Sequence, residues 1–403
     1  MKNTSTHKIL ICPRGVLQWI FTIFSFMLLA LTAFILFYMV HPSNVYNPLS
    51  FIATATSIFP FLLLIALGVI ILFALLALWR KANLAVAANF IAVLLLCSTI
   101  VYQFAGMLSL AQRENVPVSL FQNYGWQMLY KDLPKLPMTN VIYETAPDGT
   151  QLVMDIWPAQ SKNAGDPSPA IVKIHGGGWV AGERNAVRSW NQWLNSLGYT
   201  VFDIEYRLAP PVRWKDEVGD VKTAIGWVWE NADKYGIDRD RISLMGESAG
   251  GNLALLAAYT MGNDVLPPSV GNTIVPIKSV INIYGPCDLT ALYEKPISKP
   301  YIHDVLGKYI GGSTDEYGER YKTVSPINYV AKKVPPTITF QGTIDRVVPM
   351  GQAEELDKAM ADAGAYHELH LLPGADHVYD INVDSLASQY TRAKLEAFLK
   401  KYS

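Results

Sequence analysis

The stretch RISLMGESAGG, residues 241–251, combines a short apolar run with a serine flanked by glycines. The run RISLM has the composition of a buried strand, and an apolar helical pattern follows from Ala249 to Met261. Between them lies a G-x-S-x-G motif, whose turn is so tight that its flanking positions need glycine. The stretch therefore predicts a strand, a strained turn that projects the Ser248 hydroxyl above a sheet edge, and a helix.

Strand and helix patterns alternate on both sides of this motif. The β-rich runs are VIYE from Val141, QLVMDIW from Gln151, AIVKIH from Ala170, TVFDIEY from Thr200, RISLM from Arg241, SVINIYG from Ser279, TITFQ from Thr337 and HELHLL from His367. The helical patterns are Ala186 to Leu197, Val218 to Tyr235, Ala249 to Met261, Gln352 to Ala363 and Leu386 to Lys400. Strand–helix–strand order indicates parallel pairing, so residues 138–403 are expected to form an α/β-hydrolase fold with a mostly parallel eight-stranded sheet and helices on both faces.

Two segments lack a clear period. Residues 288–336 hold Tyr, Gly, Lys and Pro without one repeat, and the gap is longer than a compact domain normally leaves unstructured. We interpret it as a lid or substrate flap. Residues 111–137, broken by Pro117, Pro134 and Pro137, are interpreted as a juxtamembrane connector.

Residues 1–110 have the composition of a membrane anchor. The first 112 residues hold five of the 33 Lys and Arg residues and none of the 34 Asp and Glu residues. Three apolar stretches, about Val16 to Val40, Ser57 to Trp79 and Leu84 to Gly106, are each long enough to cross a hydrocarbon core of about 30 Å. The third is the weakest, because Asn83, Asn89 and Gln103 lie in or beside it, so an interfacial helix is the alternative. A cleaved signal peptide fits the first stretch poorly, since its apolar run is too long.

The distribution of basic residues predicts the orientation of this anchor. Lys2, Lys8 and Arg14 precede the first stretch, the loop from His41 to Ser50 is uncharged, and Arg80 and Lys81 follow the second stretch. The positive-inside rule then places the N-terminus in the cytoplasm. Three spans put the following domain on the outer side of what we expect to be a bacterial cell membrane, whereas two spans would leave it inside.

Nothing in the remaining sequence indicates a nucleic-acid partner. That part holds 28 basic and 34 acidic residues, and no basic stripe stands out among them. Cys287 is its single cysteine, so no internal disulfide is possible there. The lipid bilayer is the partner that the composition favours, and the oligomeric state is left open.

Ser248 needs a base and an acid that orients it. Of the seven histidines, His377 alone follows a predicted strand on a loop beyond the serine, in Pro373-Gly-Ala-Asp-His377. The acid of this fold comes between the serine and the histidine in chain order, which favours Asp345 in Gly342-Thr-Ile-Asp-Arg346. Asp376 is the less favoured alternative, because it neighbours the histidine and would have to fold back.

The motif HGGGW, residues 175–179, supplies donors for an oxyanion. Its glycines follow the AIVKIH strand and allow close backbone approach to a substrate, where their N–H groups join that of Ala249. Which two glycines donate is open, and we favour Gly176 and Gly177. Trp179 is a candidate substrate-binding wall and equally a core residue, and His175 is interpreted as structural.

HGGGW, YRLAP from Tyr206 to Pro210, GESAGG, GTIDRVVP and PGADH occur in the order found in hormone-sensitive-lipase-like esterases, and the stretch around GESAGG resembles bacterial carboxylesterases. The resemblance covers about Met138 to Leu399. It implies hydrolysis of carboxylic esters with short or medium acyl chains through an acyl-enzyme on Ser248, with His377 as base and Asp345 as its orienter. It implies no metal or cofactor. The sequence departs from the family at Pro211, where an acidic residue is usual.

Two other function classes remain at this stage. An acyltransferase would use the same acyl-enzyme and resolve it with an alcohol other than water. A non-catalytic binding domain on a membrane stalk is the third class, and it is weakened because nucleophile, base, acid and oxyanion glycines all occur in the expected order.

Overall fold

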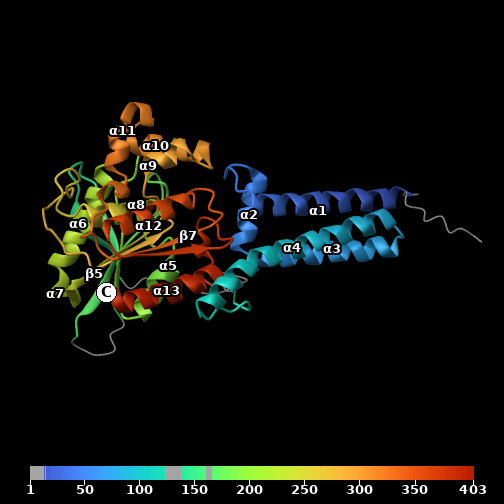
Figure 1. Cartoon of the computed structure of the whole chain (residues 1–403), viewed down its shortest axis with the longest axis horizontal. Helices are drawn as coiled ribbons and strands as arrows, with labels where there is room; N and C mark the ends of the chain where they lie inside the picture. Colours follow the sequence, from blue (N-terminus) through green and yellow to red (C-terminus); the bar gives the residue numbers. More distant parts are fainter. Residues whose placement is uncertain (1–12, 14, 123–137, 160–165) are drawn as a thin grey trace, which may run out of the picture.

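The structure is a computed structural model that describes residues 13, 15–122, 138–159 and 166–403. A bundle of long helices projects from one side of an α/β domain (Figure 1). Part of the predicted connector, residues 123–137, lies outside the described residues. So do Lys2, Lys8 and Arg14, on which the predicted orientation depends.

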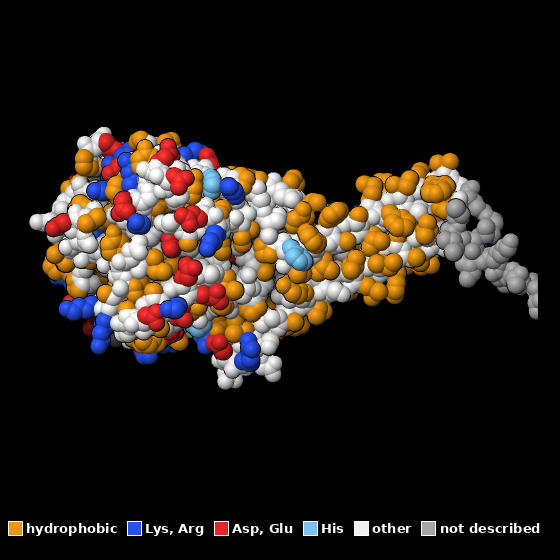
Figure 2. Space-filling model, turned by 45° about the horizontal axis from the view of Figure 1, so that its top comes forward, with side chains coloured by type: hydrophobic (Ala, Val, Ile, Leu, Met, Phe, Trp, Pro, Cys, Tyr) orange, Lys and Arg blue, Asp and Glu red, His pale blue; other side chains and the backbone are white. Residues whose placement is uncertain are grey.

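The bundle is formed by α1 (Val16–Val40), α3 (Phe61–Trp79) and α4 (Asn83–Arg113). In the described part of the chain, these three helices are long and apolar enough to cross a membrane. Apolar side chains cover the projecting arm, whereas acidic and basic side chains are scattered over the α/β domain (Figure 2). The bundle therefore has the surface expected of helices that face lipid.

The start of the second predicted span was wrong. Residues 48–58 form a separate short helix, α2 (Pro48–Ile58), which is capped by the Asn47 side chain accepting from the Leu49 N–H at 3.0 Å. Pro60 then separates α2 from α3, because proline cannot continue a helix. Much of the predicted loop His41 to Ser50 remains irregular, but its last residues belong to α2.

The third predicted span is longer than expected. α4 has 31 residues, about 46 Å at 1.5 Å per residue, which exceeds a hydrocarbon core of about 30 Å. Its last turns bury Met107 and Ala111 against the α/β domain. Two of the three polar side chains that weakened this prediction face other helices: Asn89 donates to Ser25 Oγ at 2.8 Å, and Gln103 donates to the Ser57 carbonyl at 2.7 Å. Their amide N–H groups thus bond to other helices, as polar side chains of spanning helices do. The third, Asn83, is exposed at the first position of α4.

In the described residues, eight strands form one sheet in the order β1-β2-β4-β3-β5-β6-β7-β8. They are β1 (Met138–Thr145), β2 (Gln151–Trp157), β3 (Ser168–Ile174), β4 (Thr200–Ile204), β5 (Ile237–Glu247), β6 (Val280–Ile283), β7 (Thr337–Gly342) and β8 (His367–Leu372). β1 and β2 pair antiparallel, as do β2 and β4, and all other neighbours are parallel. The predicted sheet is confirmed.

Helices cover both faces of the sheet. The first of two hydrophobic cores includes side chains of α6 (Asp216–Glu230), α8 (Ala249–Tyr259) and α12 (Gly351–Ala363), and the second includes side chains of α5 (Arg188–Ser196) and α13 (Leu386–Tyr402). A four-residue helix, α7 (Ala232–Tyr235), precedes β5. Strand side chains alternate between the two cores, with Val172 in the first and Ile171 in the second. The end of α4 joins the second core.

The predicted irregular segment 288–336 is mostly helical. It contains α9 (Leu289–Glu294), α10 (Lys299–Ile310), α11 (Thr314–Thr323) and the 3-10 turn η2 (Pro326–Tyr329). The helices are short and end at residues such as Gly311, which adopts a left-handed conformation with φ of 110°, so no long period is visible in the sequence. A role as a flap stays a prediction.

The carboxyl edge of the parallel sheet is turned toward the N-terminal helices (Figure 1). The loop after β7 contacts α1 and α2 through Arg346, and the loop after β8 contacts α2 through Asp376. A second 3-10 turn, η3 (Tyr379–Ile381), lies beyond the β8 loop, and Asn382 after it donates to the Ile58 carbonyl at 2.8 Å. Residues at this edge therefore lie next to the segment that joins α1 to α3.

Candidate active site

Ser248 occupies a strained turn between β5 and α8, with φ of 55° and ψ of −121°. Its N–H donates to the Ile283 carbonyl at 2.9 Å, which ties the turn to β6. Glycine is required on both sides, because a Cβ on Gly246 would lie 2.0 Å from the Gly250 carbonyl oxygen and one on Gly250 would lie 2.2 Å from that of Ile174. The packing therefore holds the serine in a conformation that its own side chain disfavours.

The structure brings Ser248, His377 and Asp345 together in one hydrogen-bonded line. His377 Nε2 lies 2.9 Å from Ser248 Oγ, and His377 Nδ1 lies 2.8 Å from Asp345 Oδ2. Ser248 is half-buried, and the exposed fraction of His377 is 9%. The hydroxyl can thus pass its proton to a histidine whose other ring nitrogen is held by a carboxylate, which is the arrangement of a serine nucleophile and its base.

Asp345 is fixed on both of its oxygens. Oδ1 accepts the N–H groups of Val347 and Val348, each at 2.8 Å. Oδ2 accepts from the Gln341 amide at 3.0 Å as well as from His377. These bonds orient the carboxylate toward the ring.

The pKa of His377 is raised above its usual value of 6.5. Burial of the ring alone would lower the pKa, but the facing Asp345 carboxylate outweighs it, with smaller contributions from Asp376 and Asp380. The imidazolium that would form after proton transfer is therefore stabilised by its surroundings.

Asp376, the alternative acid, has a different contact. It pairs with Arg346, and its Oδ1 accepts the backbone N–H of His377 at 2.8 Å rather than a proton from the ring. Burial raises the pKa of Asp376 above its usual value, although the Arg346 charge acts in the opposite direction. The geometry therefore favours Asp345 as the partner of the ring.

The HGGGW segment lies against the serine turn. A Cβ on Gly176 would lie 2.8 Å from the Glu247 carbonyl oxygen and 3.1 Å from Ser248 Cβ, so only glycine allows this approach. Gly177 has φ of 127°, and a Cβ there would lie 1.9 Å from the Ala181 carbonyl oxygen. The backbone of Gly176 thus lies beside the serine turn, and the oxyanion role of Gly176, Gly177 and Ala249 stays a prediction.

Trp179 and His175 are buried beside this segment. The Trp179 side chain is 2% exposed and stacks on Tyr309 with ring centroids 5.0 Å apart. His175 stacks on Tyr206 at 4.4 Å, and burial lowers its pKa. The structure thus places Trp179 in the hydrophobic core, and a contact with substrate stays a prediction.

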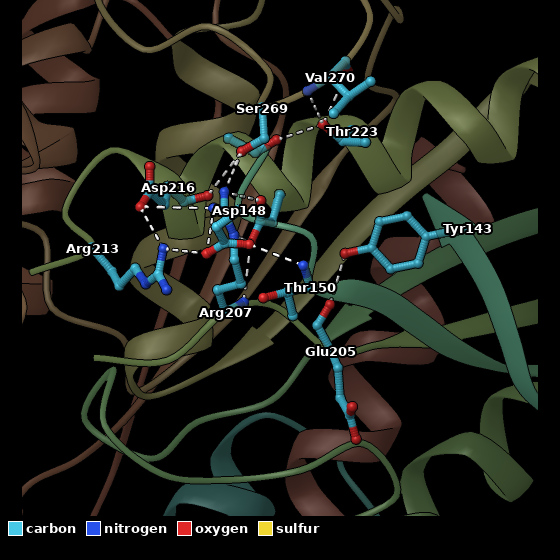
Figure 3. Close-up of polar contacts among 12 residues, drawn as sticks. Tyr143, Asp148, Thr150, Glu205, Arg207, Arg213, Asp216, Thr223, Ser269 and Val270 are labelled. Carbon is cyan, nitrogen blue, oxygen red and sulfur yellow. Dashed lines mark hydrogen bonds and ion pairs between the residues drawn. The ribbon is translucent and has the colours of Figure 1, made fainter. Parts of the chain in front are cut away.

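The YRLAP loop supports the same segment. Tyr206 donates to the His175 carbonyl at 2.9 Å, and the Ala209 N–H donates to the Trp179 carbonyl at 2.9 Å. Arg207 fixes the loop through a buried ion pair with Asp220 of α6 at 2.8 Å and through Asp148, which also binds Arg213 (Figure 3).

Sequence reasoning missed the residues that support the acid and histidine loops. Arg346 and Asp376 form a buried ion pair beside them, and Thr54 of α2 binds both members of that pair. The ring centroids of Tyr284 and His377 lie 4.6 Å apart. Arg346 lies in the GTIDRVVP motif, but no sequence signal connects it to Thr54, nearly 300 residues away.

Comparison with known proteins places this architecture in a family. Residues 154–360, just over half of the 403 residues, match the BD-FAE family. The chain belongs to the BD-FAE family. The matched range covers β2 to α12 without its ends, and it contains the HGGGW, GESAGG and GTIDR motifs, Ser248 and Asp345 among them.

Curated relatives of this BD-FAE member are named as esterases. Esterase LipQ of Mycobacterium tuberculosis is 33% identical over 58% of this chain and 56% of its own length, and Esterase LipC of the same organism is 30% identical over 63% of each chain. An isoprenylcysteine alpha-carbonyl methylesterase of Arabidopsis thaliana is 26% identical over 52% of this chain and 50% of its own length. The chain thus spans about half to two thirds of the length of these relatives.

Solved structures give the same result. A thermophilic esterase of Thermogutta terrifontis with bound propionate is 28% identical, with a TM-score of 0.56 over 66% of this BD-FAE chain and 96% of its own. The predicted α/β-hydrolase fold and the resemblance to bacterial carboxylesterases are therefore confirmed.

Proposed function

We propose that the chain is a membrane-anchored serine hydrolase that cleaves carboxylic esters with short to medium acyl chains through an acyl-enzyme on Ser248. The observation that carries the proposal is the line of contacts from Ser248 Oγ to His377 Nε2 at 2.9 Å and from His377 Nδ1 to Asp345 at 2.8 Å. The esterase names of the relatives and the propionate and butyrate complexes of the Thermogutta terrifontis enzyme support an ester substrate with a small acyl group.

In the first half-reaction, Ser248 Oγ attacks the ester carbonyl carbon while His377 Nε2 takes the hydroxyl proton. The carbonyl oxygen becomes an oxyanion, which the N–H groups of Gly176, Gly177 and Ala249 are suited to stabilise. His377 then gives its proton to the departing alkoxide, and the alcohol leaves. Asp345 stays ionised throughout and stabilises the imidazolium.

In the second half-reaction, water attacks the acyl-enzyme. His377 takes a proton from the water and returns it to Ser248 Oγ as the acid leaves. Ester and water are thereby converted to acid and alcohol, and the enzyme is regenerated.

The membrane part of the proposal rests on α1, α3 and α4, which have the length and composition of spanning helices. Three spans and the basic residues near the N-terminus would place the α/β domain on the outer side of the membrane. A membrane-impermeant fluorophosphonate added to intact cells should then label the enzyme. Labelling only after lysis would contradict this orientation.

The experiment that tests the chemistry uses the full chain in detergent. A fluorophosphonate probe should modify Ser248, as located by mass spectrometry, and p-nitrophenyl acetate and butyrate should be hydrolysed. Ser248→Ala should lose both the labelling and at least about 10⁴-fold in kcat/KM, because the nucleophile is gone. Turnover that survives in Ser248→Ala would contradict the proposal.

A further inference from the structure

A guanidinium is buried where the α/β domain meets the N-terminal helices. Arg346, the residue after Asp345, is 0% exposed, and its ion-pair partner Asp376, the residue before His377, is 1% exposed. A buried charge is expensive unless its hydrogen bonds are satisfied. The position of this pair beside both catalytic loops makes its partners relevant to the proposed reaction.

Two of those partners come from the N-terminal helices. Arg346 Nη1 donates to Thr54 Oγ1 of α2 at 3.1 Å, and Arg346 Nη2 donates to the Tyr38 carbonyl of α1. The hydroxyl of Thr54 in turn donates to Asp376 Oδ2 at 2.8 Å. Thr54 therefore binds both members of the ion pair.

The sequence explains why the Tyr38 carbonyl can accept a hydrogen bond from Arg346. Tyr38 lies in the last turn of α1, which ends at Val40, and residue 42 is a proline without an N–H. The usual partner of that carbonyl, the N–H four residues on, is thus missing. A guanidinium at a helix C-terminus is also favoured by the negative end of the helix dipole.

The ion pair is linked directly to the loops that carry the acid and the base. Asp376 Oδ1 accepts the N–H of Arg346 at 3.1 Å and the N–H of His377 at 2.8 Å. One carboxylate therefore joins the backbone beside Asp345 to the backbone of His377. Movement of this carboxylate would alter the distance between the ring and its orienting acid.

A second connection runs to the loop between α1 and α2. Ser298, which is fully buried, donates to the Arg346 carbonyl at 2.7 Å and accepts from the Val45 N–H at 3.1 Å. The backbone of Arg346 is thus held from the N-terminal segment as well as its side chain.

We infer that the segment joining α1 to α3 is a working part of the proposed active site, in which Thr54 and the Tyr38 carbonyl act through the Arg346–Asp376 pair to position His377 against Asp345 and Ser248. The inference rests on the proposed function. Thr54, Arg346 and Asp376 are positioning residues, since none of them touches the reacting atoms.

The test compares two threonines of α2 in the full chain. Thr54→Val removes the hydroxyl that binds the ion pair. Thr56→Val is the matched control, because the Thr56 hydroxyl donates to the Ala53 carbonyl of its own helix at 2.9 Å. Thr54→Ser restores the hydroxyl. The kcat and KM for p-nitrophenyl butyrate are measured per active site titrated with the fluorophosphonate, so that misfolded protein is not counted.

Thr54→Val should lower kcat about tenfold with KM little changed, because a hydrogen bond to a charged group is lost and the base is less well placed. Thr54→Ser and Thr56→Val should stay within about twofold of the unchanged protein. Equal kcat values for Thr54→Val and Thr56→Val would overturn the inference. If the protein without substitutions neither reacts with the fluorophosphonate nor hydrolyses p-nitrophenyl butyrate, the proposed function itself is contradicted.

A second variant leaves the side chains of Thr54, Arg346 and Asp376 in place. Pro42→Ala supplies an N–H that can compete with Arg346 for the Tyr38 carbonyl, and it should lower kcat by about threefold. This variant decides the matter if Thr54→Val does not fold, and an unchanged kcat in Pro42→Ala would then overturn the inference.

Discussion

The contacts described for the Ser248 turn come from the α/β domain, whereas the loops of Asp345 and His377 also contact the N-terminal helices. The serine is tied to β6, and its neighbours are enclosed by α8 and by the HGGGW segment. The acid and histidine loops meet α1 and α2 through Arg346 and Asp376, and α4 through Pro373. The α/β domain alone can therefore position Ser248, whereas the loop that carries His377 is also supported by the N-terminal helices.

The largest effect should come from the acid itself. Asp345→Asn should lower kcat about 10⁴-fold, because the ring loses the carboxylate that sets its tautomer and stabilises its charge. The same change should move the acid limb of the pH–rate profile to lower pH. The sign follows because the base must be neutral and Asp345 raises the pKa of His377.

A similar pair outside the site provides the control. Asp357 of α12 accepts from His367 Nδ1 at 2.8 Å, and His367 Nε2 lies 2.9 Å from Thr339 Oγ1 rather than from Ser248. Asp357→Asn should leave kcat and the pH profile unchanged. A comparable loss in both variants would argue against a special role for Asp345.

The second effect concerns stability at the junction. Arg346→Leu leaves Asp376 buried without its charge partner, which should destabilise the protein by about 3 to 5 kcal/mol. Arg239→Leu breaks the exposed pair with Asp233 and should shift the unfolding midpoint far less, because solvent screens that pair. Thermal unfolding in detergent measures both variants, and equal midpoints would contradict the importance of the buried pair.

The smallest effect comes from within a candidate membrane span. A Cβ on Gly106 of α4 would lie 2.6 Å from Pro373 Cβ, at the start of the histidine loop, whereas one on Gly68 of α3 would meet nothing within 4 Å. Gly106→Ala should therefore push the loop and lower kcat by about tenfold at most, as overpacking of this size costs about 1 kcal/mol. Gly68→Ala should keep full activity, and similar kcat values in the two variants would show that α4 does not support the loop.

The sequence predicted the sheet, the serine turn and the contacts of Ser248, His377 and Asp345 because these depend on local signals. Glycines at 246 and 250 and the order of strand-end motifs are visible in one chain. The helices between 288 and 336 were missed, because their short lengths and glycine ends hide a period. The Arg346–Thr54 contact was missed because a long-range pairing of ordinary residues leaves no pattern. Helix α2 was missed because its Asn47 cap was assigned to the loop His41 to Ser50 and its boundary at Pro60 to the second span.

Hydrogen–deuterium exchange on the Thr54→Val protein tests the difference between the two halves of the site most directly. The N–H groups of Arg346 and His377, both bound to Asp376 Oδ1, report on the Arg346–Asp376 pair, and residues 246–252 report on the serine turn. We predict faster exchange in peptides that cover 345–348 and 374–378, with exchange in the serine turn unchanged from the original protein. Unchanged exchange in the acid and histidine loops, or equal acceleration in the serine turn, would contradict the account.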